Sequence, residues 1–257
     1  MKKFLLSTAT MLLAATAVLA QPQQPAAQAG PKPKSQKEVD ALQKVQQATN
    51  PEERIKAIDN VLESFADTEY KPILLQMAVE SARQANDYPK VLVYGDRALQ
   101  VDPKSYTAML AMASATVQNT KEFDLDKDEK LAKVQKYANG AIEELKNAQS
   151  PNPQITAPQW DQEKKQLTAE AYADLGAVGI LQKKYDVAIN NYKSAADLYP
   201  NPVILVRMAN AYNEAKQPDN AIAAADKVLA QADAPPQVKQ FAQQEKARAE
   251  KAKTPAK

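Results

Sequence analysis

The chain has 257 residues, 44% of them hydrophobic, which is enough for one large domain or two small ones. Its 33 basic and 31 acidic residues are nearly balanced, so the charge gives no support for nucleic-acid binding. The sequence contains neither Cys nor His, which excludes disulfides, the usual zinc sites, thiol nucleophiles and histidine acid–base catalysis, and no cofactor is expected.

Residues 1–20, MKKFLLSTATMLLAATAVLA, have the pattern of a secretory signal peptide. Lys2 and Lys3 precede an apolar run, and Ala20 closes a site of small residues where cleavage is expected. The apolar run is shorter than the ~20 residues that span a bilayer. We therefore expect export to the periplasm or cell envelope and a mature chain that does not span the membrane.

The remaining chain divides by composition. Residues 21–35 are rich in Pro and Gln and predict a flexible linker. Residues 36–251 are helical in pattern, because Ala and Gln are abundant and Gly occurs only five times. Residues 252–257 predict a disordered tail.

Within the helical region the apolar spacing predicts five helical hairpins and one terminal helix. The hairpins are expected at 36–69, 72–105, 106 to about 150, 169–202 and 202–235. Val238, Phe241, Ala242 and Ala249 share one face of the terminal helix, which predicts a cap over the last hairpin. The basic stretch that follows Pro235 leaves contact with a membrane surface open.

Two segments about a hundred residues apart, 86–103 and 184–202, resemble each other when Pro103 is aligned with Pro200. The segment 169–202 is 34 residues long and has Tyr172, Leu175-Gly176, Ala188, Tyr192 and Pro200 at the places of the tetratricopeptide repeat pattern. Gly179 departs from that pattern and predicts a gap that a neighbouring side chain must fill. A hairpin of two short helices cannot bury its apolar face alone, so the hairpin must be repeated and the copies must stack on one another.

The resemblance to the tetratricopeptide repeat family implies an all-α, right-handed superhelical solenoid. It also implies that the first helix of each repeat lines an inner groove that holds a protein or peptide partner. The groove positions are then Ile73, Gln76, Glu80, Arg83, Thr107, Leu110, Ser114, Val117, Glu170, Ala173, Ala177, Ile180, Val203, Val206, Asn210 and Asn213. Changing Leu110 and Val206 to Asp is expected to abolish binding without changing melting.

An irregular insertion is expected at 120–168. Asp124, Asp126 and Asp128 alternate as in a calcium loop, but Glu129 stands where that loop needs Gly, so no metal site is expected. Asp126 is better explained as a helix N-cap with Glu129 in a capping box. Trp160, the single Trp, is either a packing anchor or a ligand platform.

Together these features predict a non-enzymatic scaffold of the periplasm or cell envelope that binds a protein or peptide. Two alternatives stay open. One is a subunit of an outer-membrane assembly or cell-wall coordination complex. The other is an enzyme whose site lies in the 150–168 part of the insertion.

Overall fold

The computed structural model describes residues 30–152 and 154–254. The chain divides into two units, Met1–Pro31 and Lys32–Lys257, and the second contains all the helices discussed below. The expected signal peptide, residues 21–29 of the expected linker and residues 255–257 of the expected tail lie outside the described residues.

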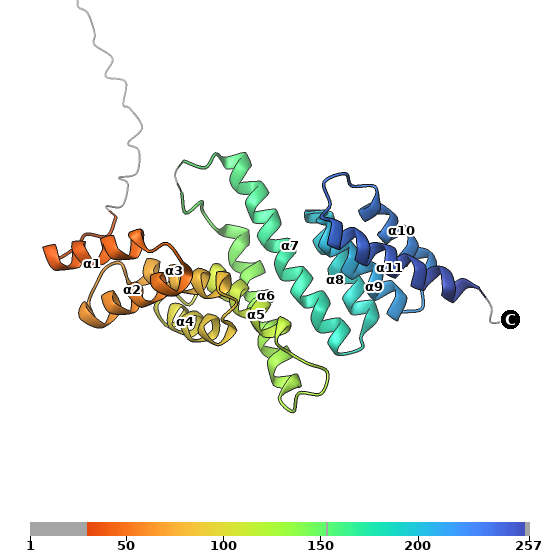
Figure 1. The fold of residues 1–257 in the computed structure, drawn as a ribbon, viewed down its shortest axis with the longest axis horizontal. Coiled ribbons are helices and arrows are strands. Elements are labelled where there is room, and N and C mark those ends of the chain that lie inside the picture. Colours follow the sequence, from red (N-terminus) through yellow and green to blue (C-terminus); the bar gives the residue numbers. More distant parts are fainter. Residues whose placement is uncertain (1–29, 153, 255–257) are drawn as a thin grey trace, which may run out of the picture. The chain divides into compact units, whose positions relative to one another are not determined.

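Between residues 30 and 254, residue 153 apart, the chain forms eleven helices and no strand, which confirms the all-α prediction (Figure 1). Ten of them pair into consecutive hairpins and the last stands alone. The bounds are α1 Gln36–Gln47, α2 Pro51–Ser64, α3 Lys71–Gln84, α4 Tyr88–Val101, α5 Tyr106–Gln118, α6 Lys127–Asn147, α7 Ala157–Leu181, α8 Tyr185–Leu198, α9 Pro202–Glu214, α10 Pro218–Leu229 and α11 Pro236–Lys253.

Three hairpins turn through the same local structure. Asn86, Lys183 and Lys216 have φ of 54°, 58° and 59°, and each lies two positions before the first residue of a second helix. In each turn the next amide donates to a carbonyl five residues back, as in Lys184 N to Gly179 O at 2.8 Å and Gln217 N to Tyr212 O at 2.8 Å. This bond is that of the Schellman motif, which ends the first helix and sends the chain back along it.

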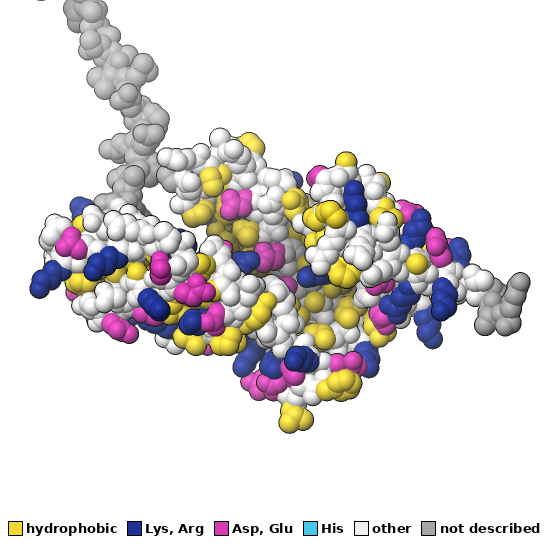
Figure 2. All heavy atoms as spheres, in the orientation of Figure 1, with side chains coloured by type: hydrophobic (Ala, Val, Ile, Leu, Met, Phe, Trp, Pro, Cys, Tyr) yellow, Lys and Arg dark blue, Asp and Glu magenta, His cyan; other side chains and the backbone are white. Residues whose placement is uncertain are grey.

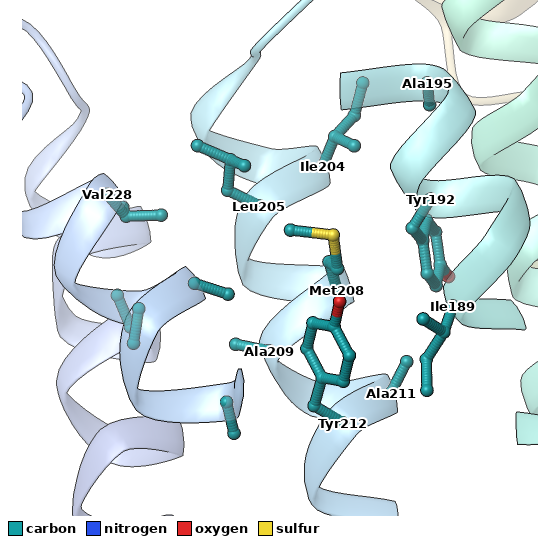
Figure 3. Packing of buried hydrophobic residues seen from close by; sticks show 14 of the residues in the cluster. Ile189, Tyr192, Ala195, Ile204, Leu205, Met208, Ala209, Ala211, Tyr212 and Val228 are labelled. Carbon is teal, nitrogen blue, oxygen red and sulfur yellow. The ribbon is translucent and has the colours of Figure 1, made fainter. Parts of the chain in front are cut away.

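Stacking of the hairpins buries three successive apolar clusters. One joins α1 to α5, the second joins α5, α6 and α7, and the third runs from α7 to α11. Figure 3 shows the third, in which Met208 and Tyr212 of α9 lie between Tyr192 and Ile189 of α8 and Val228 of α10. Because α5 and α7 contribute to two clusters each, the hairpins form one continuous α-solenoid core.

Small residues allow α7 and α8 to approach closely. A Cβ on Gly176 would lie 2.6 Å from the ring of Tyr192, and one on Gly179 would lie 2.7 Å from the backbone N of Ala188. The prediction that Gly179 leaves a gap is therefore wrong, because the backbone of α8 itself occupies that space.

The expected insertion at 120–168 is mostly helical. It contains α6 and the first half of α7, which begins at Ala157, well before the repeat expected from Ala169. Asp126 is the N-cap residue of α6, but its side chain makes no capping bond. Its carboxylate instead pairs with Lys130 Nζ at 2.9 Å, so the predicted capping box does not form.

Trp160 packs where three helices meet, and it is 6% exposed. Its Nε1 donates to the carbonyl of Ala148 at 2.9 Å, and its ring lies 6.4 Å from that of Tyr106. A capping box between Thr156 and Gln159 starts α7 immediately before it. These contacts match the packing-anchor interpretation of Trp160.

The last residues of the expected linker contact the first two hairpins. Lys34 Nζ pairs with Asp67 at 2.7 Å, and its amide donates to Glu38 Oε2 at 2.6 Å. Glu38 is 1% exposed and also accepts from Thr68 Oγ1 at 2.6 Å. At the other end, α11 continues to Lys253, two residues beyond the expected end of the helical region.

Candidate functional site

The first helices of four successive hairpins contribute to two cavities on one face of the solenoid. The first cavity, about 350 Å³, lies between α3, α5 and α7 and has an apolar lining that includes Ile73, Met77, Leu110 and Leu167. The second, about 340 Å³, lies between α5, α7 and α9 and includes Val117, Ile180 and Val206. Figure 2 shows this face as a hollow with hydrophobic side chains in its depth and single charged ones beside them. We call the two cavities together the inner groove.

Most of the residues expected in the groove line one of these cavities. The first holds Ile73, Gln76, Glu80, Arg83, Thr107, Leu110 and Glu170. The second holds Val117, Ala177, Ile180, Val206 and Asn210. Ser114, Ala173, Val203 and Asn213 line neither of them. The structure thus brings together residues from four helices that lie up to 137 positions apart in the sequence, from Ile73 to Asn210.

Three of the expected groove residues belong mainly to the core. Leu110 is 2% exposed, Ala173 5% and Val117 7%, because α5 and α7 are flanked by helices on both sides. An Asp at Leu110 would place an unpaired charge in that core, so from the structure we expect this change to lower the melting temperature, contrary to the expectation from the sequence. Ile73, which is 46% exposed, offers a better test position.

The two expected groove amides of α9 already have partners within the chain. Asn210 Nδ2 donates to Glu245 Oε1 at 3.1 Å, and Asn213 Nδ2 donates to Glu245 Oε2 at 2.7 Å and to its backbone carbonyl at 2.9 Å. Glu245 belongs to α11, whose packing beside α9 could not be inferred from the spacing in α9 alone. Asn213 is therefore a contact of the terminal helix, and Asn210 shares its side chain between that contact and the second cavity.

Acidic side chains outnumber basic ones around the first cavity. Arg83 lies 3.5 Å from Glu80 and 3.7 Å from Glu170, so one guanidinium serves two carboxylates. All three side chains are at least one-third exposed, and such ion pairs contribute little to stability. Their charges matter more for what the cavity can attract than for holding the fold together.

Asp174 is a groove-face residue that the sequence interpretation missed. It lies on α7 one turn after Glu170 and one turn before Ala177, it is 3% exposed, and its Oδ2 has no hydrogen-bond partner among the described residues. Burial, with a smaller effect of Glu170, raises the pKa of Asp174 to about 8, although Arg207 and Arg83 act in the opposite direction. A single acid in the apolar run AYADLGAV was the signal that could have indicated it.

A second pair of cavities lies on the other side of α5, between α4 and α6. They share Asp96 and Tyr137, and their floor includes Met112 in one and Met109 in the other. Lys130, Lys133 and Lys136 of α6 line them, but Lys130 pairs with Asp124 at 2.8 Å and Lys133 with Glu129 at 2.9 Å. The sequence interpretation did not predict these cavities, since the 34-residue pattern says little about the gap between second helices.

Within the described ranges, no group of three or more acidic side chains is arranged to hold a metal ion. Asp124 instead accepts a hydrogen bond from Lys130 Nζ at 2.8 Å, as part of the turn that leads into α6. No helix of residues 30–254, among those described, has both the length and the apolar character needed to cross a bilayer.

Comparison with solved structures supports the tetratricopeptide repeat fold. A thermophilic tetratricopeptide repeat protein of Thermus thermophilus superposes with a TM-score of 0.54 at 16% identity, covering 81% of this chain and 98% of its own. A tetratricopeptide repeat protein from Parabacteroides merdae covers 85% of this chain and 93% of its own, with a TM-score of 0.43 and 15% identity. No family model and no curated protein matches the sequence. The chain thus has the fold of a tetratricopeptide repeat α-solenoid.

Proposed function

We propose that this protein is a non-enzymatic scaffold that binds a segment of another protein in the inner groove. The observation that supports this most directly is the meeting of side chains from α3, α5, α7 and α9 in two apolar cavities on one face. Rigid stacked hairpins hold these cavities preformed, which lowers the entropic cost of binding. The total absence of His and Cys from the sequence removes the commonest catalytic groups.

The proposal is tested by removing apolar surface from both cavities without adding charge. The variant is Ile73→Gln with Val206→Gln, one change in each cavity. Each change removes part of an apolar contact worth about 1 kcal/mol, so together they should weaken partner binding about tenfold or more. The measurement is the yield of partner in parallel pull-downs from the cell of origin, quantified by mass spectrometry.

The matched control carries the same change on the second helices. Val93 of α4 and Val187 of α8 are 55% and 47% exposed and line neither cavity of the groove. The double variant Val93→Gln, Val187→Gln should bind as the wild type does, and both doubles should melt close to it. Equal loss of binding in the two doubles, or no loss in either, would contradict a groove site.

We further propose that the protein acts in the periplasm or cell envelope. The support is the signal-like pattern of residues 1–20. Expression of the full chain in a Gram-negative host, followed by osmotic-shock fractionation and mass measurement, should return a periplasmic species shortened at Ala20. A full-length species in the cytoplasm would argue against export.

A second candidate is a subunit of an envelope assembly or cell-wall coordination complex. One observation favours it: Phe123 is 89% exposed and Leu125 fully exposed in the loop between α5 and α6. This loop is held in place by Lys183, which pairs with Glu122 at 2.8 Å. The test compares co-purification of partner proteins with two variants, one without the groove contacts and one with Ser in place of these two side chains. Partners that remain bound to the first variant but are lost from the second would favour this candidate.

The enzyme alternative has little support. Its expected location, residues 150–168, contains a short loop and the first turns of α7, where Trp160 is engaged in packing.

A further inference from the structure

Asp174 differs from the other deeply buried carboxylate of the described chain in having an unused oxygen. Glu38 is as buried, at 1% exposure, but its two oxygens accept hydrogen bonds from Thr68 and from the Lys34 amide. Oδ2 of Asp174 accepts none from the described residues. Burying a carboxyl oxygen without a donor costs about 1–3 kcal/mol, so a donor supplied from outside would recover that free energy.

The position of Asp174 along α7 lies between the residues that line the two cavities, although Asp174 itself lines neither. Along α7, Leu167 and Glu170 line the first cavity and Ala177 and Ile180 the second, while Asp174 lies between them on the same stripe. The charged groups that act on it come from both sides, since Arg83 lines the first cavity and Arg207 the second. A segment that fills both cavities must therefore pass beside Asp174.

The charges around the first cavity favour a cation over an anion or a neutral group. Glu80 and Glu170 share the single guanidinium of Arg83, which leaves the first cavity with one negative charge in excess, and Glu170 also acts on Asp174, which is itself protonated at about pH 7. Arg207 opposes this from the α9 side, and Tyr192 faces the same region from α8. On this balance, an ammonium or guanidinium group is the donor that fits, because it both donates hydrogen bonds and offsets the excess negative charge.

We propose that Asp174 is the polar anchor of the inner groove and takes the cationic end of a lysine or arginine that the bound segment presents between apolar residues. This inference rests on the proposed function. The α7 residues of the two cavities are centred about ten positions apart, or ~15 Å at 1.5 Å per residue. An extended segment covers that distance in about five residues, so its apolar side chains should stand about five positions apart with the basic residue between them.

The experiment uses a random dodecapeptide library displayed on phage and selected against the purified chain. Selected peptides should carry Lys or Arg between apolar residues at this spacing. In a synthetic copy, replacing the basic residue by Met should weaken binding to the wild type at least about tenfold, as measured by fluorescence polarisation. For the Asp174→Asn variant, replacing the basic residue of the peptide by Met should change affinity less than about twofold, because the carboxylate that pairs with that residue is already absent.

Glu38→Gln is the matched control, since it neutralises the other buried carboxylate, which lies on α1 away from the groove. It should show the same dependence on the basic residue as the wild type. Titration calorimetry at about pH 7 in two buffers of different ionisation enthalpy adds an independent readout. The cation should ionise Asp174, so the wild type should release close to one proton per peptide and Asp174→Asn none.

The outcomes separate the two proposals. One outcome is that the peptides bind the Ile73→Gln, Val206→Gln variant more weakly but do not need a basic residue. This result would overturn the role of Asp174 as anchor, while the proposal that the groove binds a segment would stand. A Lys-to-Met effect of equal size in the wild type and in Asp174→Asn would also overturn the anchor, and would mean that solvent alone satisfies its oxygen. If the peptides bind the Ile73→Gln, Val206→Gln variant as tightly as the wild type, or if the selection returns no binding peptide, the result would count against the groove as a binding site.

Discussion

At the scale of single residues, Asp174 makes stability depend on pH. Its pKa is about 8 in the fold and 3.8 when exposed, so between these values the folded chain holds a proton that the unfolded chain has released. The free energy of unfolding therefore falls as pH rises from about 4 to about 8, since the ionised form is disfavoured by burial. Because one pKa unit corresponds to about 1.4 kcal/mol, the loss can reach several kcal/mol.

Asp174→Asn should remove this dependence. The variant keeps the shape of the side chain and cannot ionise, so it should be more stable than the wild type at about pH 8 and nearly equal to it at about pH 4. Urea unfolding at the two pH values measures the difference. A constant difference between variant and wild type across that range would show that Asp174 is charged throughout.

At the scale of elements, the turn between α9 and α10 carries avoidable strain. Lys216 has φ 59°, a conformation that costs a residue with a Cβ about 1–2 kcal/mol and costs Gly almost nothing. Lys216 is held in this conformation because the Schellman hydrogen bond from Gln217 N to Tyr212 O, at 2.8 Å, requires a left-handed residue in the turn.

Lys216→Gly should therefore stabilise the protein by about 0.5–1 kcal/mol, despite the greater freedom of Gly in the unfolded chain. Lys227→Gly is the control: this exposed residue lies inside α10, where Gly costs about 1 kcal/mol. Thermal melting followed by circular dichroism measures both. A lower melting temperature for Lys216→Gly would show that its side chain makes stabilising contacts that outweigh the strain.

At the scale of the whole solenoid, α11 closes the end of the stack. Ala242 and Ala249 are fully buried against α9 and α10, and Arg248 pairs with Glu214 at 2.7 Å. The prediction of a capping face holds for these two alanines and for Val238, which packs against the same cluster, whereas Phe241 is 48% exposed and does not join the buried face as expected. Polar contacts such as Lys246 with Asp226, at 2.7 Å, tie the outer side of the helix to α10.

A chain that ends at Ala234 should lose stability and associate. Without α11, the apolar faces of α9 and α10 are open to water, and Glu245 no longer satisfies Asn210 and Asn213. We expect a melting temperature lower by about 5 °C or more and dimers or larger species by light scattering. A chain that ends at Thr254 is the control and should match the wild type, and a shortened chain that stays monomeric and equally stable would disprove the capping role.

Much of the fold could be predicted from the sequence, because helix formation and hairpin turns depend on neighbours along the chain. Apolar spacing, scarce Gly and the prolines after the second helices were enough to predict five hairpins and the terminal helix, although α7 begins at Ala157, inside the expected insertion. The resemblance to the tetratricopeptide repeat family implied which face of each first helix lines the groove, and side chains three, four and seven positions apart share such a face. That register is why most of the expected groove residues do line the two cavities.

Only the tertiary structure decided how deeply each groove position is buried, because burial depends on the distance and angle between helices that are remote in sequence. Leu110 and Val117 were expected to be open to a partner, and α6 and α7 cover them. Asp174 is an unpaired buried carboxyl only in the folded chain, where the packing around α7 removes it from water and no described residue donates to Oδ2. The local pattern thus determined which side chains face inward, while packing determined which of them can still be reached.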